Sequence, residues 1–255
     1  MPLPVIFETL DLPASDGAAD SYFARPDDGR AHPGLLLFMD AYGLRPVLRD
    51  IVETIAAQGF TVLAPNIFYR SGRAPLLPLP APDNMNGHAE FFAAIGPARH
   101  ALTGEKALQD AKSYLDWLSA SEFVTSGALA VSGYCMGGRL ALRTAGTFGD
   151  RVTVAASFHG GRLAEAEDPT SPHHAAEHVS AELFIAHADH DASMPPDKIG
   201  LLERALDDAG TKYTSVVYRN ARHGFTMRDT PAYDEAAYQR HLRDLFALLE
   251  RARWT

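Results

Sequence analysis

The segment Gly133-Tyr134-Cys135-Met136-Gly137-Gly138 follows the short apolar run Ala128–Val131 and precedes a helix-compatible stretch, Arg139–Thr147. The order of strand, sharp turn and helix places a side chain that can act as a nucleophile at the apex of the turn. Glycines two positions before and after the apex let the backbone turn tightly, because they have no Cβ to clash. The apex residue is Cys135, the only cysteine of the chain. The pattern therefore predicts a cysteine nucleophile on a strand-to-helix turn.

Short apolar runs alternate with longer helix-compatible segments along the rest of the chain. This alternation predicts an α/β fold with a mostly parallel central sheet and helices on both faces. We expect Thr230 to cap the last helix, with Pro231 at its first position, and we expect a long surface loop over Ser71–Gly87. The further expected strands are Leu35–Met39, Phe60–Ala64, Val152–Phe158, Leu183–Ala186 and Tyr213–Tyr218. The further expected helices are Val47–Gln58, Glu105–Ser119, Asp197–Ala209 and Ala232–Arg253.

Length and composition limit the classes of protein to which the chain can belong. Its 255 residues are 46% hydrophobic and 22% charged, and the alternation runs without a linker, so we expect one domain over residues 1–255. The formal charge of −9 argues against nucleic-acid binding. We see no secretory signal and no apolar stretch long enough to span a membrane, and one cysteine cannot form an intramolecular disulfide. These features predict a cytoplasmic protein.

A thiol nucleophile needs a base, and the base needs a carboxylate to orient it. His223 is the natural base among 11 histidines, because it follows the last expected strand and precedes Gly224. Asp191 follows the strand Leu183–Ala186 and can orient an imidazole, and Asp189 is its rival two residues earlier. In parallel sheets such groups lie on loops at the carboxyl ends of strands. We therefore expect Cys135, His223 and one of these aspartates to meet.

Each of these assignments has a plainer structural alternative. A free cysteine most often fills space in a core. A histidine can lie on the surface without a function, and an aspartate in this position can be a turn or cap residue. His174 and His178 have the spacing of two ligands on one helical face, but a loop is expected there and no H-E-x-x-H motif occurs, so we expect no metal site.

The chain resembles the dienelactone hydrolase family of the α/β-hydrolase fold. The resemblance covers nearly the whole chain, and its D-x-x-x-P spacing favours Asp191 over Asp189 as the acid of the triad. The order of nucleophile, acid and histidine is also that of α/β-hydrolases. The segments that carry the resemblance are Met39-Asp40-Ala41-Tyr42-Gly43, Gly133-Tyr134-Cys135-Met136-Gly137-Gly138, Asp191-Ala192-Ser193-Met194-Pro195 and His223-Gly224-Phe225.

The resemblance also implies further site residues. The backbone N–H groups of Ala41 and Met136 would form the oxyanion hole. Asp40 stands where the family usually has a glutamate that contacts the nucleophile, and it is one methylene shorter. The family holds a substrate carboxylate with arginines, one of them four positions after the histidine, but Met227 occupies that position here. Arg228 is adjacent to it, and Arg99 lies near the expected place of the other arginine.

The predicted function is hydrolysis of a small-molecule ester or lactone through a Cys135–His223–Asp191 triad and an acyl-thioester intermediate. We expect no cofactor, no nucleic-acid or membrane partner, and a monomer or small homo-oligomer. Tyr134 and His159 are expected to line the pocket. The alternatives are a thioesterase or general carboxylesterase on the same fold, or a non-catalytic binding protein that retains the fold.

Overall fold

The computed structural model describes residues 2–127 and 129–252. Its contacts divide the chain into two compact units, Met1–Leu129 and Ala130–Thr255. The expectation of one domain over the whole chain stays a prediction. Within the described ranges, no helix is long and apolar enough to cross a membrane.

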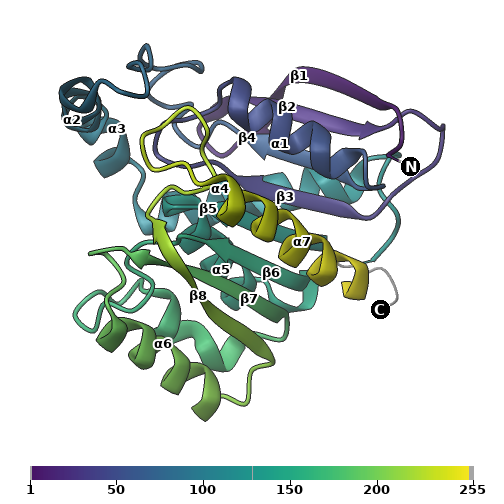
Figure 1. The fold of residues 1–255 in the computed structure, drawn as a ribbon. Helices are drawn as coiled ribbons and strands as arrows, with labels where there is room; N and C mark the ends of the chain where they lie inside the picture. Colours follow the sequence, from purple (N-terminus) through teal and green to yellow (C-terminus); the bar gives the residue numbers. More distant parts are fainter. Residues whose placement is uncertain (1, 128, 253–255) are drawn as a thin grey trace. The chain divides into compact units, whose positions relative to one another are not determined.

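The first unit contains an antiparallel hairpin of β1 (Val5–Ala14) and β2 (Gly17–Pro26). β2 also pairs antiparallel with β4 (Thr61–Pro65), which in turn pairs parallel with β3 (Gly34–Phe38) (Figure 1). The hairpin was not predicted, because polar residues interrupt the apolar pattern of both strands and only Leu12 of β1 is buried. The helices of this unit are α1 (Pro46–Ala56), α2 (Met85–Ala94), α3 (Gly96–Ala101) and α4 (Gly104–Ala120).

The central elements of the first unit follow from their apolar patterns. Every residue of β3 and β4 is buried, as the continuous apolar runs predict. In α1 the buried side chains recur at helical spacing, and Pro46 occupies the first turn, where its missing N–H has no cost. Thr103 caps α4, because its side chain accepts a hydrogen bond from the N–H of Lys106.

The second unit carries the nucleophile turn and three parallel strand ends. β6 (Val152–Phe158) pairs parallel with β7 (Glu182–His190), and β7 pairs parallel with β8 (Tyr213–Arg222). In Figure 1 the yellow α7 passes in front of β6 and β7, and α5 lies behind them, so helices cover both faces. This arrangement confirms the predicted α/β class. The remaining elements are β5 (Leu129–Tyr134), α5 (Met136–Thr147), α6 (Pro196–Asp208), α7 (Glu235–Ala252) and the 3₁₀ helices η1 (Gly149–Arg151) and η2 (Pro172–His178).

The strands predicted over Leu183–Ala186 and Tyr213–Tyr218 were too short, since β7 continues to His190 and β8 to Arg222. Two predicted helix starts were wrong because different residues cap the helices. The last helix begins at Glu235 rather than Ala232, since Asp234 accepts a hydrogen bond from the N–H of Ala237 at 2.8 Å. The hydroxyl of Thr230 instead donates to the carbonyl of Met227. The expected loop over Ser71–Gly87 ends early, because Asn84 caps α2. Residues 128 and 253, which bound two expected elements, lie outside the described residues.

The turn at Cys135 depends on close contacts between glycine backbones. A Cβ on Gly133 would lie 2.1 Å from the carbonyl oxygen of Gly137, and one on Gly138 would lie 2.4 Å from Oγ of Ser157. Both distances are far below van der Waals contact. The backbone of β5 therefore packs directly on the first turn of α5, which holds Cys135 at the apex.

We expect Gly133→Ala to lower the free energy of unfolding by about 1–3 kcal/mol or more, because a backbone atom blocks the new methyl group. Urea denaturation of the full chain measures this loss. Gly96→Ala is the matched control, since nothing lies within 4 Å of its Cβ position on α3. If Gly133→Ala were as stable as Gly96→Ala, the close approach of the backbones would not constrain the turn.

Candidate active site

Cys135 lies at the apex of the turn between β5 and α5. Its φ of 56° and ψ of −119° are in a region that a non-glycine residue rarely adopts. Its N–H donates to the carbonyl of Phe158 at 3.1 Å, which ties the apex to the end of β6. The thiol is free and partly exposed. Such backbone strain persists only where the surrounding structure enforces it, and it is common at active sites.

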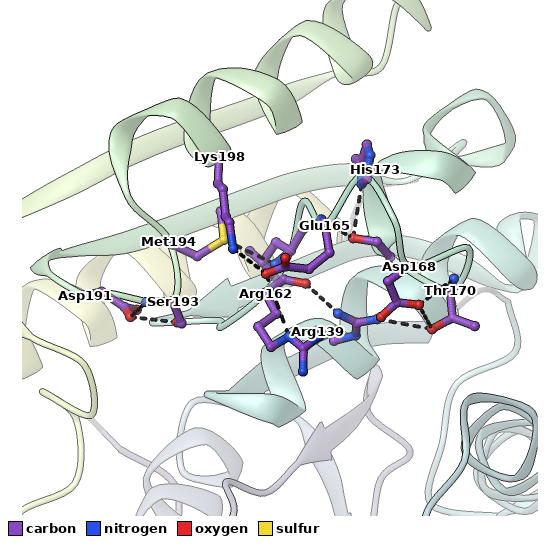
Figure 2. A network of polar contacts seen from close by, with 12 residues as sticks. Arg139, Arg162, Glu165, Asp168, Thr170, His173, Asp191, Ser193, Met194 and Lys198 are labelled. Atoms are coloured by element: carbon purple, nitrogen blue, oxygen red, sulfur yellow. Dashed lines mark hydrogen bonds and ion pairs between the residues drawn. The ribbon is translucent and has the colours of Figure 1, made fainter.

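Asp191 follows β7 directly, and two bonds from one residue hold its carboxylate. Oδ1 accepts from the N–H of Ser193 at 2.8 Å and from its hydroxyl at 2.6 Å (Figure 2). The Asp191 side chain is only 3% exposed. Asp189, the rival in the sequence, instead accepts from the N–H of Asn220 at 3.0 Å, which links β7 to β8.

His223 follows β8 directly and joins the other two residues. Its Nδ1 lies 2.6 Å from Oδ2 of Asp191, and its Nε2 lies 3.0 Å from Sγ of Cys135. The three side chains come from the loops after β5, β7 and β8, as expected for loops at strand ends. The structure thus brings together Cys135, His223 and Asp191, and it keeps Asp189 out of this line of contacts.

The charged forms of His223 and Asp191 stabilise each other. Burial lowers the pKa of His223, but the neighbouring Cys135 sulfur and the Asp191 carboxylate outweigh burial and raise this pKa well above its usual value. Burial would raise the pKa of Asp191, but the hydrogen bonds from His223 and Ser193 hold it below its usual value. The geometry therefore stabilises the imidazolium form of His223 beside the Asp191 carboxylate. The neutral imidazole can accept a proton from the thiol, and the imidazolium formed in this way can return it later.

A layer of buried aromatic side chains lies against His223. His159 is completely buried at a positive φ of 41°, and its ring lies edge-on to His223 at 5.4 Å between centroids. Its Nε2 lies 2.7 Å from Oγ1 of Thr226. Burial, and then the charge of His223, lowers the pKa of His159 well below its usual value. A neutral imidazole thus packs behind the charged one.

Tyr134 and His159 were expected to line the pocket, and the structure places both deeper than that. Tyr134 is also completely buried, and its hydroxyl lies 2.9 Å from Nε2 of His241. Burial lowers the pKa of His241 to about 3. The two residues support the strand ends from within the core. The sequence analysis missed His241 and Thr226, because neither belongs to a motif.

A polar network joins the start of α5 to the loop after β6 and to the segment that carries Asp191 (Figure 2). Arg139 donates to the carbonyl of Arg162 at 2.6 Å and to the carboxylate of Asp168 at 2.7 Å. Lys198 donates to Glu165 at 2.6 Å. The network thus holds the loop after β6 from α5 through Arg139 and from α6 through Lys198.

The remaining predicted residues lie partly in the first unit. Both oxygens of Asp40 accept from Arg45, at 2.6 and 2.9 Å, and this ion pair is buried. Oδ1 of Asp40 also accepts from the N–H of Tyr42. Ala41 lies between these residues and is buried. The functions assigned to Asp40 and to the N–H groups of Ala41 and Met136 stay predictions.

Two further expectations concern recognition of a substrate carboxylate near position 227 and the binding of a metal ion. Met227, the residue four positions after His223, is buried at 1% exposure. Within residues 2–127 and 129–252, no group of three or more His, Cys, Asp or Glu side chains is arranged to hold a metal ion.

Comparison with known proteins identifies relatives of the whole chain. The model of the dienelactone hydrolase family matches residues 19–253. A candidate carboxymethylenebutenolidase of Salmonella typhi is 24% identical over 230 residues, which cover 89% of this chain and 80% of that protein. A candidate 2-oxo-3-(5-oxofuran-2-ylidene)propanoate lactonase of a Bradyrhizobium species is 24% identical over 240 residues, covering 92% of this chain and 90% of that protein.

Solved structures show the same fold. A candidate dienelactone hydrolase from Klebsiella pneumoniae superposes with a TM-score of 0.83 at 20% identity, over 96% of this chain and 98% of that one. A dienelactone hydrolase-like promiscuous phosphotriesterase from metagenomic libraries gives a TM-score of 0.75 at 20% identity, over 97% and 98% of the two chains. The predicted α/β-hydrolase fold is thereby confirmed, and the chain belongs to the dienelactone hydrolase family.

Proposed function

We propose that this protein hydrolyses ester or lactone bonds through a covalent acyl-thioester on Cys135. The observation that carries the proposal is the continuous line of contacts from Sγ of Cys135 through His223 to Asp191, with both distances in hydrogen-bond range. A nucleophile, a base and an orienting carboxylate in this order are the parts that covalent acyl transfer needs. Membership of a hydrolase family supports the same reaction class.

In the first half-reaction His223 takes the proton of the Cys135 thiol, and the thiolate attacks the carbonyl carbon of the substrate. The imidazolium formed in this step is stabilised by Asp191, whose pKa is held below its usual value. The C–O bond to the leaving group then breaks, and the departing oxygen takes the proton from His223. A lactone ring opens in this step without releasing a second molecule.

The negative charge that develops on the carbonyl oxygen needs donors that already point toward it. We assign one donor to the N–H of Met136, the residue after Cys135 at the start of α5. We assign the second donor to Ala41 by resemblance to the family. Each such donor can lower the barrier by about 3 kcal/mol.

In the second half-reaction a water molecule attacks the thioester, and His223 accepts its proton. The thiolate leaves as the tetrahedral intermediate collapses and takes the proton from His223, the acid product departs, and the triad returns to its first state. A thiolate is a good leaving group, so the first tetrahedral intermediate can also collapse backwards. Substrates with a stabilised leaving group, such as an enolate, avoid this loss. The amine of an amide is a poor leaving group, so an amide substrate does not avoid this backward collapse. We therefore exclude a protease from the proposal.

The names of two relatives suggest the substrate class. A butenolide and an oxofuranylidene compound are both unsaturated five-membered lactones. Opening such a ring releases an enolate oxygen, which suits the leaving-group requirement of a cysteine nucleophile. We therefore propose an unsaturated lactone as the preferred substrate, ahead of a simple ester or an acyl thioester.

We expect Cys135→Ala to lower kcat/KM for an unsaturated lactone and for an aryl ester by at least about 10³-fold, because the covalent route is lost. Steady-state kinetics on lactone, aryl ester and acyl-thioester substrates measure the loss and rank the three substrate classes. Ser132→Ala is the matched control and should keep the activity, since this buried hydroxyl lies three residues before Cys135. Full activity of Cys135→Ala on every substrate would refute the mechanism.

We expect Asp191→Asn to lower the pKa of the His223 imidazolium, because the carboxylate that raises it is gone. The imidazolium of the variant should therefore lose its proton at a lower pH than that of the wild type. The value of kcat/KM should fall by roughly 10²- to 10⁴-fold. Ring ¹⁵N chemical shifts of His223 across the pH range measure the first effect, and kinetics measure the second.

Asp189→Asn is the control for this experiment, because Asp189 bonds to the N–H of Asn220 and not to the imidazole. It should leave the titration of His223 unchanged. The assignment of Asp191 as the orienting acid fails if the two variants shift the titration of His223 equally.

A further inference from the structure

A second polar site lies beside the C-terminal half of α5, beyond Cys135 in the sequence. A cavity of about 200 Å³ opens there between α5 and the segment that includes η2. Arg143 is eight residues after Cys135, which is a little over two turns or about 12 Å along a helix. We call this cavity the Arg143 pocket. The polar residues that line it are Arg143, Thr147, Thr170, Ser171, His174 and His178.

Arg143 is a largely buried cation that makes no direct ion pair with any described residue. The residue is 9% exposed, and across the described ranges its guanidinium has no ion pair and no hydrogen bond. Burial of an arginine is normally accompanied by a carboxylate partner, because an unpaired buried charge is costly. An anion that enters the pocket would supply this partner.

The one carboxylate close to this arginine is already bound elsewhere. Asp168 bonds through Oδ2 to Arg139 at 2.7 Å, and through Oδ1 to the N–H and hydroxyl of Thr170 (Figure 2). Arg139 lies four residues before Arg143, so two like charges lie on one helix face, and Asp168 pairs directly with Arg139. Burial and then repulsion by Arg139 lower the pKa of Arg143, and the carboxylate of Asp168 offsets part of this effect.

The rim of the pocket offers donors to an anion. Arg143 and Ser171 are buried at its base, whereas Thr147, His174 and His178 are exposed around its opening. Neither the hydroxyl of Thr147 nor the ring nitrogens of His174 are hydrogen-bonded within the part of the chain that the structure describes. The acidic neighbour at the rim is Glu177, whose carboxylate lies 3.5 Å from His178.

We infer that the Arg143 pocket binds the phosphate group of a small molecule. A guanidinium fork can donate to two oxygens of a tetrahedral oxyanion, and the hydroxyl of Thr147 and the ring of His174 line the same pocket as further hydrogen-bonding groups. The cavity of about 200 Å³ holds such a group with room for a small organic substituent. The site is separate from the triad, so its occupant does not compete with the substrate for Cys135.

Binding to the full-length protein tests this site directly. Calorimetry and thermal unfolding are followed as inorganic phosphate replaces sodium chloride at constant ionic strength. We expect saturable binding and a saturable rise in Tm. Arg143→Met should weaken phosphate binding by roughly tenfold or more, and Arg143→Lys should weaken it less because it keeps the charge. Arg219→Met, the same change at an exposed arginine, should bind like the wild type.

Three results would overturn the inference. The first is a wild-type protein that responds to phosphate no more than to chloride, and the second is an Arg143→Met variant that binds as well as Arg219→Met. The third is loss of binding when Cys135 is alkylated, since the anion would then occupy the active site. An equal response to acetate contradicts the assignment to phosphate, whereas stronger binding of glycerol phosphate than of inorganic phosphate supports an organic substituent. All readouts are independent of turnover, so they stand even if the proposed hydrolysis fails.

Discussion

The contact between Sγ of Cys135 and Nε2 of His223 is the interaction on which the rest of the site depends. It requires the sulfur to stand clear of its own strand and helix, and this in turn requires the unusual backbone angles at Cys135. Those angles require Gly133 and Gly138, because any Cβ at either position would collide with neighbouring atoms. A constraint on two glycines is thus transmitted to the position of one sulfur atom.

Hydrogen bonds, charge and packing hold Asp191 and His223, the two partners of Cys135, in place. Asp191 is held by Ser193 on one oxygen and by His223 on the other, so the acid cannot rotate away from the imidazole without losing several hydrogen bonds. Behind the imidazole, buried His159 is neutral and packs edge-on against it. The positive charge is therefore confined to His223, between the thiol and the carboxylate. This is the charge arrangement that acyl transfer through a thiolate requires.

The sequence predicted the parts of this site that depend on local pattern. The turn around Cys135 shows glycines at fixed spacing, and Asp191 and His223 each come shortly after a predicted strand, although β7 and β8 continue further toward them than predicted. Features that depend on three-dimensional packing could not be predicted in the same way. Tyr134 and His159 look like pocket residues in sequence but are buried, because the strand ends they occupy face the core. The unpaired charge of Arg143 appears only when Asp168 is seen to bind Arg139.

The most direct test of the proposed chemistry is the identification of the acylated residue during turnover. An aryl ester is mixed with the protein, the reaction is quenched in acid within the first turnover, and the protein is digested and analysed by mass spectrometry. We predict one acyl group on the peptide that contains Cys135, on the sulfur, and its absence in Cys135→Ala. Continued turnover without acylation of Cys135, or with acylation of another residue such as Ser132, would contradict the account.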